Sequence, residues 1–190
     1  MKDVKTILKL SVTLLLISAF VAGALAGVNA ITKDRIAAIL ENKIQSALEE
    51  VLPGAVNLTE VEFTDESGIV KTVYAPSADS PVQGYAVEVA PAGFGGSITM
   101  MVGVDENGKV ASISVVSHTE TASLGAVAAD KGSAGTAFRE QFKGQSAGMS
   151  VGKEIDSITG ATITSKAVTN GVNAALAAVE KLMQGGAVTK

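Results

Sequence analysis

The chain contains no cysteine and no tryptophan, and its one histidine is His118. The lack of cysteine excludes disulfides, thiolate metal sites and cysteine nucleophiles. One histidine is too few for zinc or haem sites, which are built from several nitrogen or sulfur ligands. The net charge of −4 also argues against a basic surface for nucleic acid. Any chemistry must therefore come from hydroxyls, carboxylates and backbone groups, or from a bound cofactor.

Charge is missing from a long stretch near the N-terminus, because residues 10–32 are 23 consecutive uncharged residues. About 20 such residues are enough to span the hydrocarbon core of a membrane. Residues 1–9 contain three lysines and one aspartate, and a positive flank favours the cytoplasmic side. The sequence therefore predicts a single-pass protein of the cell (inner) membrane, with a cytoplasmic N-terminus and an extracytoplasmic main domain.

A cleaved signal peptide is the alternative interpretation of the same stretch. Ala24-Leu25-Ala26 and Val28-Asn29-Ala30 both resemble cleavage sites made of small residues. The uncharged run is longer than the apolar part of a usual signal peptide, about 7 to 15 residues. The length favours a retained anchor.

The rest of the chain is predicted to be a helix followed by an α+β domain. Residues 33–52 carry apolar side chains every three or four positions, which indicates a stalk helix, and Pro53-Gly54 ends it. Residues 53–190 then form the main domain, with antiparallel hairpins and a C-terminal helix. Strands are expected at 61–64, 69–74, 84–90, 98–104 and 110–116, an extended piece at 152–158, and helices at 136–142 and 163–183.

The segment before the last helix is rich in hydroxyl groups. In the structural interpretation, Thr159, Thr162 or Thr164 caps the helix and Gly160 eases the turn. In the functional interpretation, the hydroxyls and the free amides at a helix N-terminus form a site for a phosphate group. The residues alone leave both interpretations open.

The same segment, Asp156-x-x-Thr159-Gly160-Ala161-Thr162, resembles the D-x-x-[ST]-G-A-[ST] flavinylation motif of membrane redox proteins. The resemblance implies one FMN per chain, which a dedicated flavin transferase joins through a phosphoester to Thr162. His118-Thr119-Glu120-Thr121-Ala122-Ser123-Leu124-Gly125 resembles the H-x-E-T-P-G-L-G segment of the same proteins, with Ala-Ser in place of Pro-Gly. Gly93-Phe94-Gly95-Gly96-Ser97-Ile98 and Val51-Leu52-Pro53-Gly54-Ala55 also fit their pattern.

The resemblance extends over nearly the whole chain and is greatest to the RnfG proteins of the Rnf ion-translocating electron-transport complex. It implies that Thr121, Leu124 and Gly125 pack against the flavin ring, while Glu120 orients their loop. It places five residues near the phosphate, namely Thr159, Gly160, Ala161, Ile163 and Thr164. Asp156 is assigned to the transferase reaction, and His118 to a structural role. No resident metal and no separate catalytic residue are expected.

The function implied is electron transfer through covalent FMN in a ferredoxin:NAD oxidoreductase that transports sodium ions or protons. The chain would act with the other membrane subunits of the complex and would not be catalytic alone. No G-x-G-x-x-G follows a strand, so the chain itself is not expected to bind NAD. The alternatives are a component like the NqrC protein of the sodium-pumping NADH:quinone oxidoreductase, a stand-alone extracytoplasmic flavoprotein, or a membrane-anchored binding or scaffold domain without a cofactor.

Overall fold

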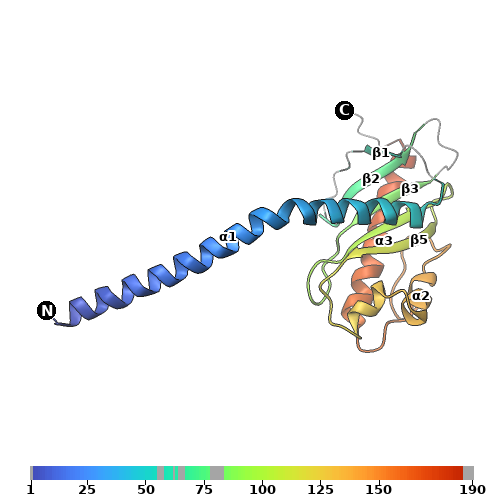
Figure 1. Ribbon diagram of the computed structural model, residues 1–190. Coiled ribbons are helices and arrows are strands. Elements are labelled where there is room, and N and C mark those ends of the chain that lie inside the picture. Colours follow the sequence, from blue (N-terminus) through green and yellow to red (C-terminus); the bar gives the residue numbers. More distant parts are fainter. Residues whose placement is uncertain (1, 55–57, 62, 64–66, 78–83, 186–190) are drawn as a thin grey trace. The chain divides into compact units, whose positions relative to one another are not determined.

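The computed structural model describes residues 2–54, 58–61, 63, 67–77 and 84–185. The chain divides into two compact units, Met1–Asn42 and Lys43–Lys190. The helices and strands of both units are labelled in Figure 1.

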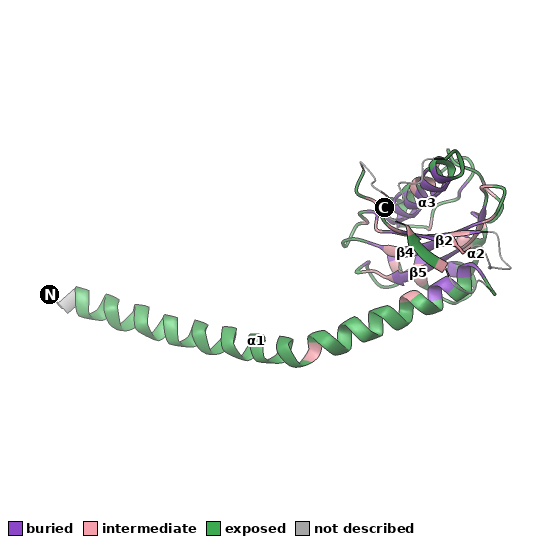
Figure 2. Cartoon of the chain, turned by 90° about the horizontal axis from the view of Figure 1, so that it is seen from above, coloured by how far each residue is buried: buried purple, intermediate pink, exposed green. Residues whose placement is uncertain are grey.

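The first unit is helical. Helix α1 runs without a break over Lys2–Val51, so the predicted membrane and stalk helices form one continuous element. Its apolar side chains are exposed along the uncharged stretch; Leu14 and Phe20, for example, are 67% and 79% exposed (Figure 2). In the described part of the chain, α1 is the helix long and apolar enough to cross a membrane, consistent with a single membrane anchor.

The second unit is built on a five-stranded antiparallel sheet, which confirms the predicted α+β class. Its strands follow one another across the sheet in chain order, β1-β2-β3-β4-β5. They span Leu58–Val61, Val70–Pro76, Tyr85–Val89, Thr99–Val104 and Val110–Ser117. The predicted Asn107-Gly108 turn joins the last two strands, and the Asp105 carboxylate accepts the Asn107 and Lys109 amides, both at 2.9 Å.

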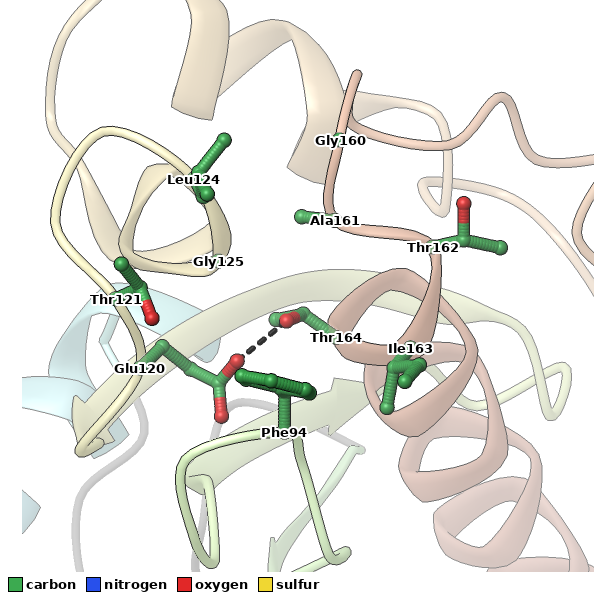
Figure 3. Close-up of a pocket in the computed structure, with 10 residues that line it drawn as sticks. All are labelled: Phe94, Glu120, Thr121, Leu124, Gly125, Gly160, Ala161, Thr162, Ile163 and Thr164. Atoms are coloured by element: carbon green, nitrogen blue, oxygen red, sulfur yellow. Dashed lines mark hydrogen bonds between the residues drawn. The ribbon is translucent and has the colours of Figure 1, made fainter.

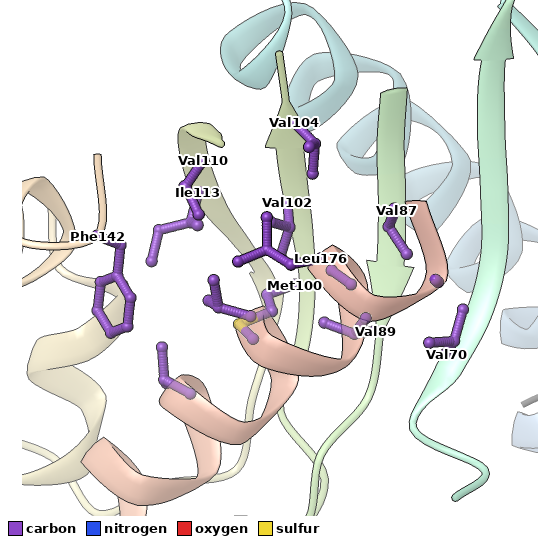
Figure 4. Packing of buried hydrophobic residues seen from close by; sticks show 14 of the residues in the cluster. Val70, Val87, Val89, Met100, Val102, Val104, Val110, Ile113, Phe142 and Leu176 are labelled. Carbon is purple, nitrogen blue, oxygen red and sulfur yellow. The ribbon is translucent and has the colours of Figure 1, made fainter. Parts of the chain in front are cut away.

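One face of the sheet packs against the C-terminal helix, α3, which spans Thr162–Met183. Val87 and Val102 of the sheet and Val172 of α3 are fully buried in this main core (Figure 4). Gly171 allows close packing there, because a Cβ atom would collide with the Met100 side chain.

The other face of the sheet packs against the end of α1. Side chains alternate between the faces of a strand, so Ala86 and Met101 point away from the main core. They form a second buried cluster with Leu48 and Val51 of α1. At Gly103 the sheet and the helix come so close that a Cβ atom would collide with the Val51 carbonyl.

The connection between β5 and α3 differs most from the prediction. It contains a 3-10 helix, Gly125–Ala129, and helix α2, Ser133–Glu140, which begins three residues before the predicted helix. The predicted extended piece at 152–158 is wrong: it is a turn closed by a single bridge between Val151 and Ile155.

The first hairpin also differs from the prediction. The structure ends β1 at Val61 rather than starting it there, and Phe63 lies outside the strand. Residues 62 and 64–66, on which the rest of this prediction falls, lie outside the described residues.

Candidate functional site

A cavity of about 350 Å³ lies where three segments of the second unit meet. The segments are the glycine-rich loop before β4, the loop after β5 and the start of α3 (Figure 3). The lining residues are Phe94, Glu120, Thr121, Leu124, Gly125, Gly160, Ala161, Thr162, Ile163 and Thr164. The volume is within the usual range of small-ligand sites, about 300–1,000 Å³.

The structure brings together nine of the residues singled out from the sequence. Thr162 lines the cavity with Gly160, Ala161, Ile163 and Thr164 from its own segment. Glu120, Thr121, Leu124 and Gly125 line it from the loop after β5. Two predicted residues do not line it, Thr159 and Asp156. Both are exposed, and the Asp156 amide donates to the Gln141 side chain at 2.7 Å.

Helix α3 begins without a side-chain cap. Its N-cap residue is Ala161, so the structural interpretation that gave this role to a threonine is wrong. The amides of Thr162, Ile163 and Thr164 belong to the first helical turn, where no preceding turn supplies carbonyl partners. The partial positive charge of a helix N-terminus therefore lies at the wall of the cavity.

The turn before α3 is held in place by Ser165, whose side chain is fully buried. Its hydroxyl accepts the Ile158 amide at 3.0 Å and donates to the Ala161 carbonyl at 3.0 Å. Gly160 has φ = 76°, in the left-handed region that favours glycine. These features fix the backbone on which Thr162 is presented.

A buried carboxylate joins the three segments of the site. Glu120 is 9% exposed, and its Oε1 accepts the Gly95 amide at 2.9 Å. Its Oε2 accepts a hydrogen bond from the hydroxyl of Thr164, which is 1% exposed (Figure 3). Gly125 provides the space, because a Cβ atom there would collide with both side chains.

The loop after β5 has two further features. His118 lies outside the cavity lining, and its Nδ1 accepts the Glu120 amide at 3.2 Å. Ser123 has φ = 62° and is the non-glycine residue with positive φ among the described positions. The related segment has glycine at this position, so the substitution puts strain into the loop.

The electrostatics of the cavity are unusual for a phosphate site. Glu120 is the one charged residue among the ten that line it, and none of them is lysine or arginine. Hydroxyls and backbone amides are thus the groups available for a phosphate. The apolar side chains of Phe94, Leu124 and Ile163 suit a flat aromatic ligand.

Sequence reasoning missed Phe94. The glycine-rich segment that contains it was recognised as part of a pattern, but no role was given to its aromatic side chain. The signal available was a large apolar residue between glycines, which pack closely against other backbone and leave it on the surface.

The fold and the site define a cofactor-binding domain that follows an apolar N-terminal helix. Residues 93–177 match the FMN-binding domain family, and residues 1–51 match the N-terminal region of RnfG proteins. Together with the relatives described next, these matches show that the chain belongs to the RnfG family of FMN-binding subunits.

Several curated relatives, each the RnfG component of its complex, match along nearly their whole length. The one from the Na⁺-translocating ferredoxin:NAD⁺ oxidoreductase complex of Acetobacterium woodii is 33% identical over 95% of both chains. The one from the proton-translocating complex of Clostridium ljungdahlii is 35% identical over 85% of this chain and 86% of its own. The one from an ion-translocating oxidoreductase complex of Methanosarcina acetivorans is 30% identical over 93% and 96%, respectively.

Proposed function

We propose that this chain is the electron-transfer RnfG component of a membrane-bound, ion-translocating ferredoxin:NAD oxidoreductase complex. One FMN per chain is attached to Thr162 through a phosphoester. The observation that carries the proposal is the position of Thr162: it is the exposed first residue of α3, at the wall of a ligand-sized cavity. Membership of the complex is supported by relatives that are named as components of such complexes.

Thr162 is the best placed of the three motif hydroxyls. The Thr164 hydroxyl is buried and donates to Glu120, so it is shielded from a modifying enzyme. Thr159 is exposed but does not line the cavity. Thr162 alone combines exposure with a place in the lining. Asp156 is exposed as well, so a flavin transferase can reach it when the ester forms.

The chemistry of the lining explains why a covalent bond is needed. The first-turn amides of α3 favour a phosphate, but one helix N-terminus contributes only about 0.3–1 kcal/mol. No lysine or arginine lines the cavity to add to this attraction. On the outer side of a membrane, a phosphate held so weakly would dissociate into a large volume. The phosphoester at Thr162 removes that loss.

The bound flavin supplies the redox chemistry, since it exchanges electrons singly or in pairs. The residues of the chain hold it. The first turn of α3 receives the phosphate, and Gly160 and Ala161 leave room for it. Thr121, Leu124 and Gly125 line the region of the ring, and Glu120 fixes their loop against α3.

The proposal includes a retained anchor and one orientation. Helix α1 crosses the membrane, and its three flanking lysines lie in the cytoplasm. The flavin domain then lies outside, where it exchanges electrons with other membrane subunits of the complex while the complex transports a cation.

The test is a comparison of covalent labelling in two variants of Thr162. The full chain is produced with a flavin transferase, denatured, and examined by in-gel flavin fluorescence and intact mass. The wild type and Thr162→Ser should carry one FMN, because both keep a hydroxyl, whereas Thr162→Val should carry none. Flavin retained on the Val variant would show that another residue is the acceptor.

A further inference from the structure

Exposed apolar side chains of the second unit gather at the cavity. Beyond α1, four large hydrophobic residues are exposed in the part of the chain that the structure describes. Three of them line the cavity, namely Phe94, Leu124 and Ile163, and the fourth is Met183 near the end of α3. Phe94 is the most exposed of the four, at 69%. A cluster of exposed apolar groups on a folded domain marks a binding site.

The backbone around Phe94 is firmly held. The Gly93 amide donates to the Gly96 carbonyl at 2.7 Å, which closes the loop on itself. The Gly95 amide donates to Glu120, and the Thr119 hydroxyl donates to the Gly95 carbonyl, both at 2.9 Å.

The close contact between the two loops requires glycine beside Phe94. A Cβ atom at Gly95 would collide with the Thr119 carbonyl. The aromatic ring is therefore presented to solvent by an ordered loop, and a ligand meets it without first having to order that loop.

The position of Phe94 relative to Leu124 suggests its role. In Figure 3 the two side chains lie on different sides of the lining, with Ala161 and Thr164 between them in the view. They come from the loops before β4 and after β5, which Glu120 links through the Gly95 amide. A flat conjugated ring fits between an aromatic face and a branched aliphatic side chain.

We propose that Phe94 and Leu124 form an apolar clamp on the isoalloxazine ring, with Phe94 as the stacking residue. The inference rests on the proposed function and extends it to the ring-binding groups. Phe94 positions the cofactor and takes no part in its attachment, which the Thr162 ester provides. The clamp shields the ring from water in the isolated protein.

The rival explanation is that the exposed apolar residues contact another protein of the complex. In that case they shield nothing in the isolated chain. Iodide quenching of flavin fluorescence separates the two explanations, because iodide reaches the ring only from solvent. The full, flavinylated chain in detergent is the sample, and the denatured chain gives the value for a fully accessible ring.

Three variants are compared with the wild type. Phe94→Ala should raise the native quenching constant by roughly two- to tenfold, the factor that corresponds to one lost aromatic stacking contact. Phe94→Tyr should stay near the wild type because it keeps the aromatic face. Met183→Ala, at an exposed apolar residue away from the cavity lining, should leave the constant unchanged. Covalent labelling should be equal in all.

A quenching constant in Phe94→Ala equal to that of Met183→Ala would overturn the clamp and leave the attachment site standing. A wild type without covalent flavin would instead overturn the attachment. The clamp is then tested by titrating free riboflavin, which has the ring but no phosphate, into the unlabelled chain. Weaker binding to Phe94→Ala than to Met183→Ala supports the clamp, and equal or undetectable binding overturns it.

Discussion

The hydroxyl of Thr164 donates a hydrogen bond to the carboxylate of Glu120, and both side chains are buried. The bond joins the first turn of α3 to the loop after β5. Because the other oxygen of Glu120 accepts the Gly95 amide, one carboxylate ties together all three segments that line the cavity. The shape of the site therefore depends on a polar contact between residues that are far apart in the sequence.

Thr164→Val should destabilise the domain, because valine keeps the shape of the side chain but cannot donate to Glu120. A buried acceptor left without its partner costs about 1–3 kcal/mol. The expected result is a lower urea midpoint for unfolding with an unchanged slope. Thr164→Ser is the control and should stay closer to the wild type. Equal midpoints for the Val variant and the wild type would show that the bond contributes nothing to stability.

Ser123→Gly should stabilise the loop after β5. Ser123 has φ = 62°, and a left-handed conformation costs a residue with a side chain about 1–2 kcal/mol. Glycine avoids this cost but has a more flexible unfolded chain, so the expected net gain is about 0.5–1 kcal/mol. Thermal melting measures it. Ser123→Ala keeps the strain and should show no gain, and a similar rise in both variants would rule out backbone strain as the cause.

Regular elements with a clear period were predictable from the sequence. The three- and four-residue spacing of Val168, Val172 and Leu176 gave α3 nearly to its observed ends, because a helix face must repeat at that interval to pack on a sheet. The Asn-Gly turn gave the β4–β5 hairpin for a similar local reason.

Features that depend on distant contacts were not predictable. A threonine near a helix start is typical of a cap, yet Thr164 donates to Glu120, 44 residues away, and Ala161 is at the cap position. Residues 152–158 were predicted to be extended, but Gly152 has φ = 91° and the segment turns. The place of Phe94 also depends on the contact of its loop with residues 119 and 120.

The turn that precedes the motif should respond to acid through Glu154. The Ser150 amide donates to this exposed carboxylate at 2.9 Å, and that hydrogen bond is the main reason why the pKa of Glu154 lies below its usual value. The Glu154 amide and the Ser150 hydroxyl lower the pKa further. A lowered pKa stabilises the fold above the pKa of the unfolded chain, and this contribution is lost as the pH falls through the folded value.

Glu154→Gln removes that titration. The wild type should melt at a higher temperature than the variant near neutral pH, and the difference should shrink as the pH falls below about 4. Melting temperatures of both proteins across this range provide the measurement. A difference that stays constant with pH would mean that the charge of Glu154 is not its source.

Gly160→Ala should impair both the fold and the labelling of Thr162. Gly160 has φ = 76°, and a Cβ atom there would lie 3.1 Å from Leu124 Cδ2, inside the cavity lining. Gly152→Ala is a matched control, because Gly152 has φ = 91° and no atom within 4 Å of the added carbon. Both variants should lose about 1–2 kcal/mol of stability from the left-handed backbone.

Covalent flavin separates the two variants. Only Gly160→Ala puts a methyl group where the cofactor must enter and pushes on Leu124, so only this variant should show less in-gel flavin fluorescence at equal amounts of folded protein. Equal labelling of the two would mean that the turn before Thr162 tolerates the added methyl group. Equal losses would assign the effect to strain alone, because the crowding at Leu124 is the feature that the control lacks.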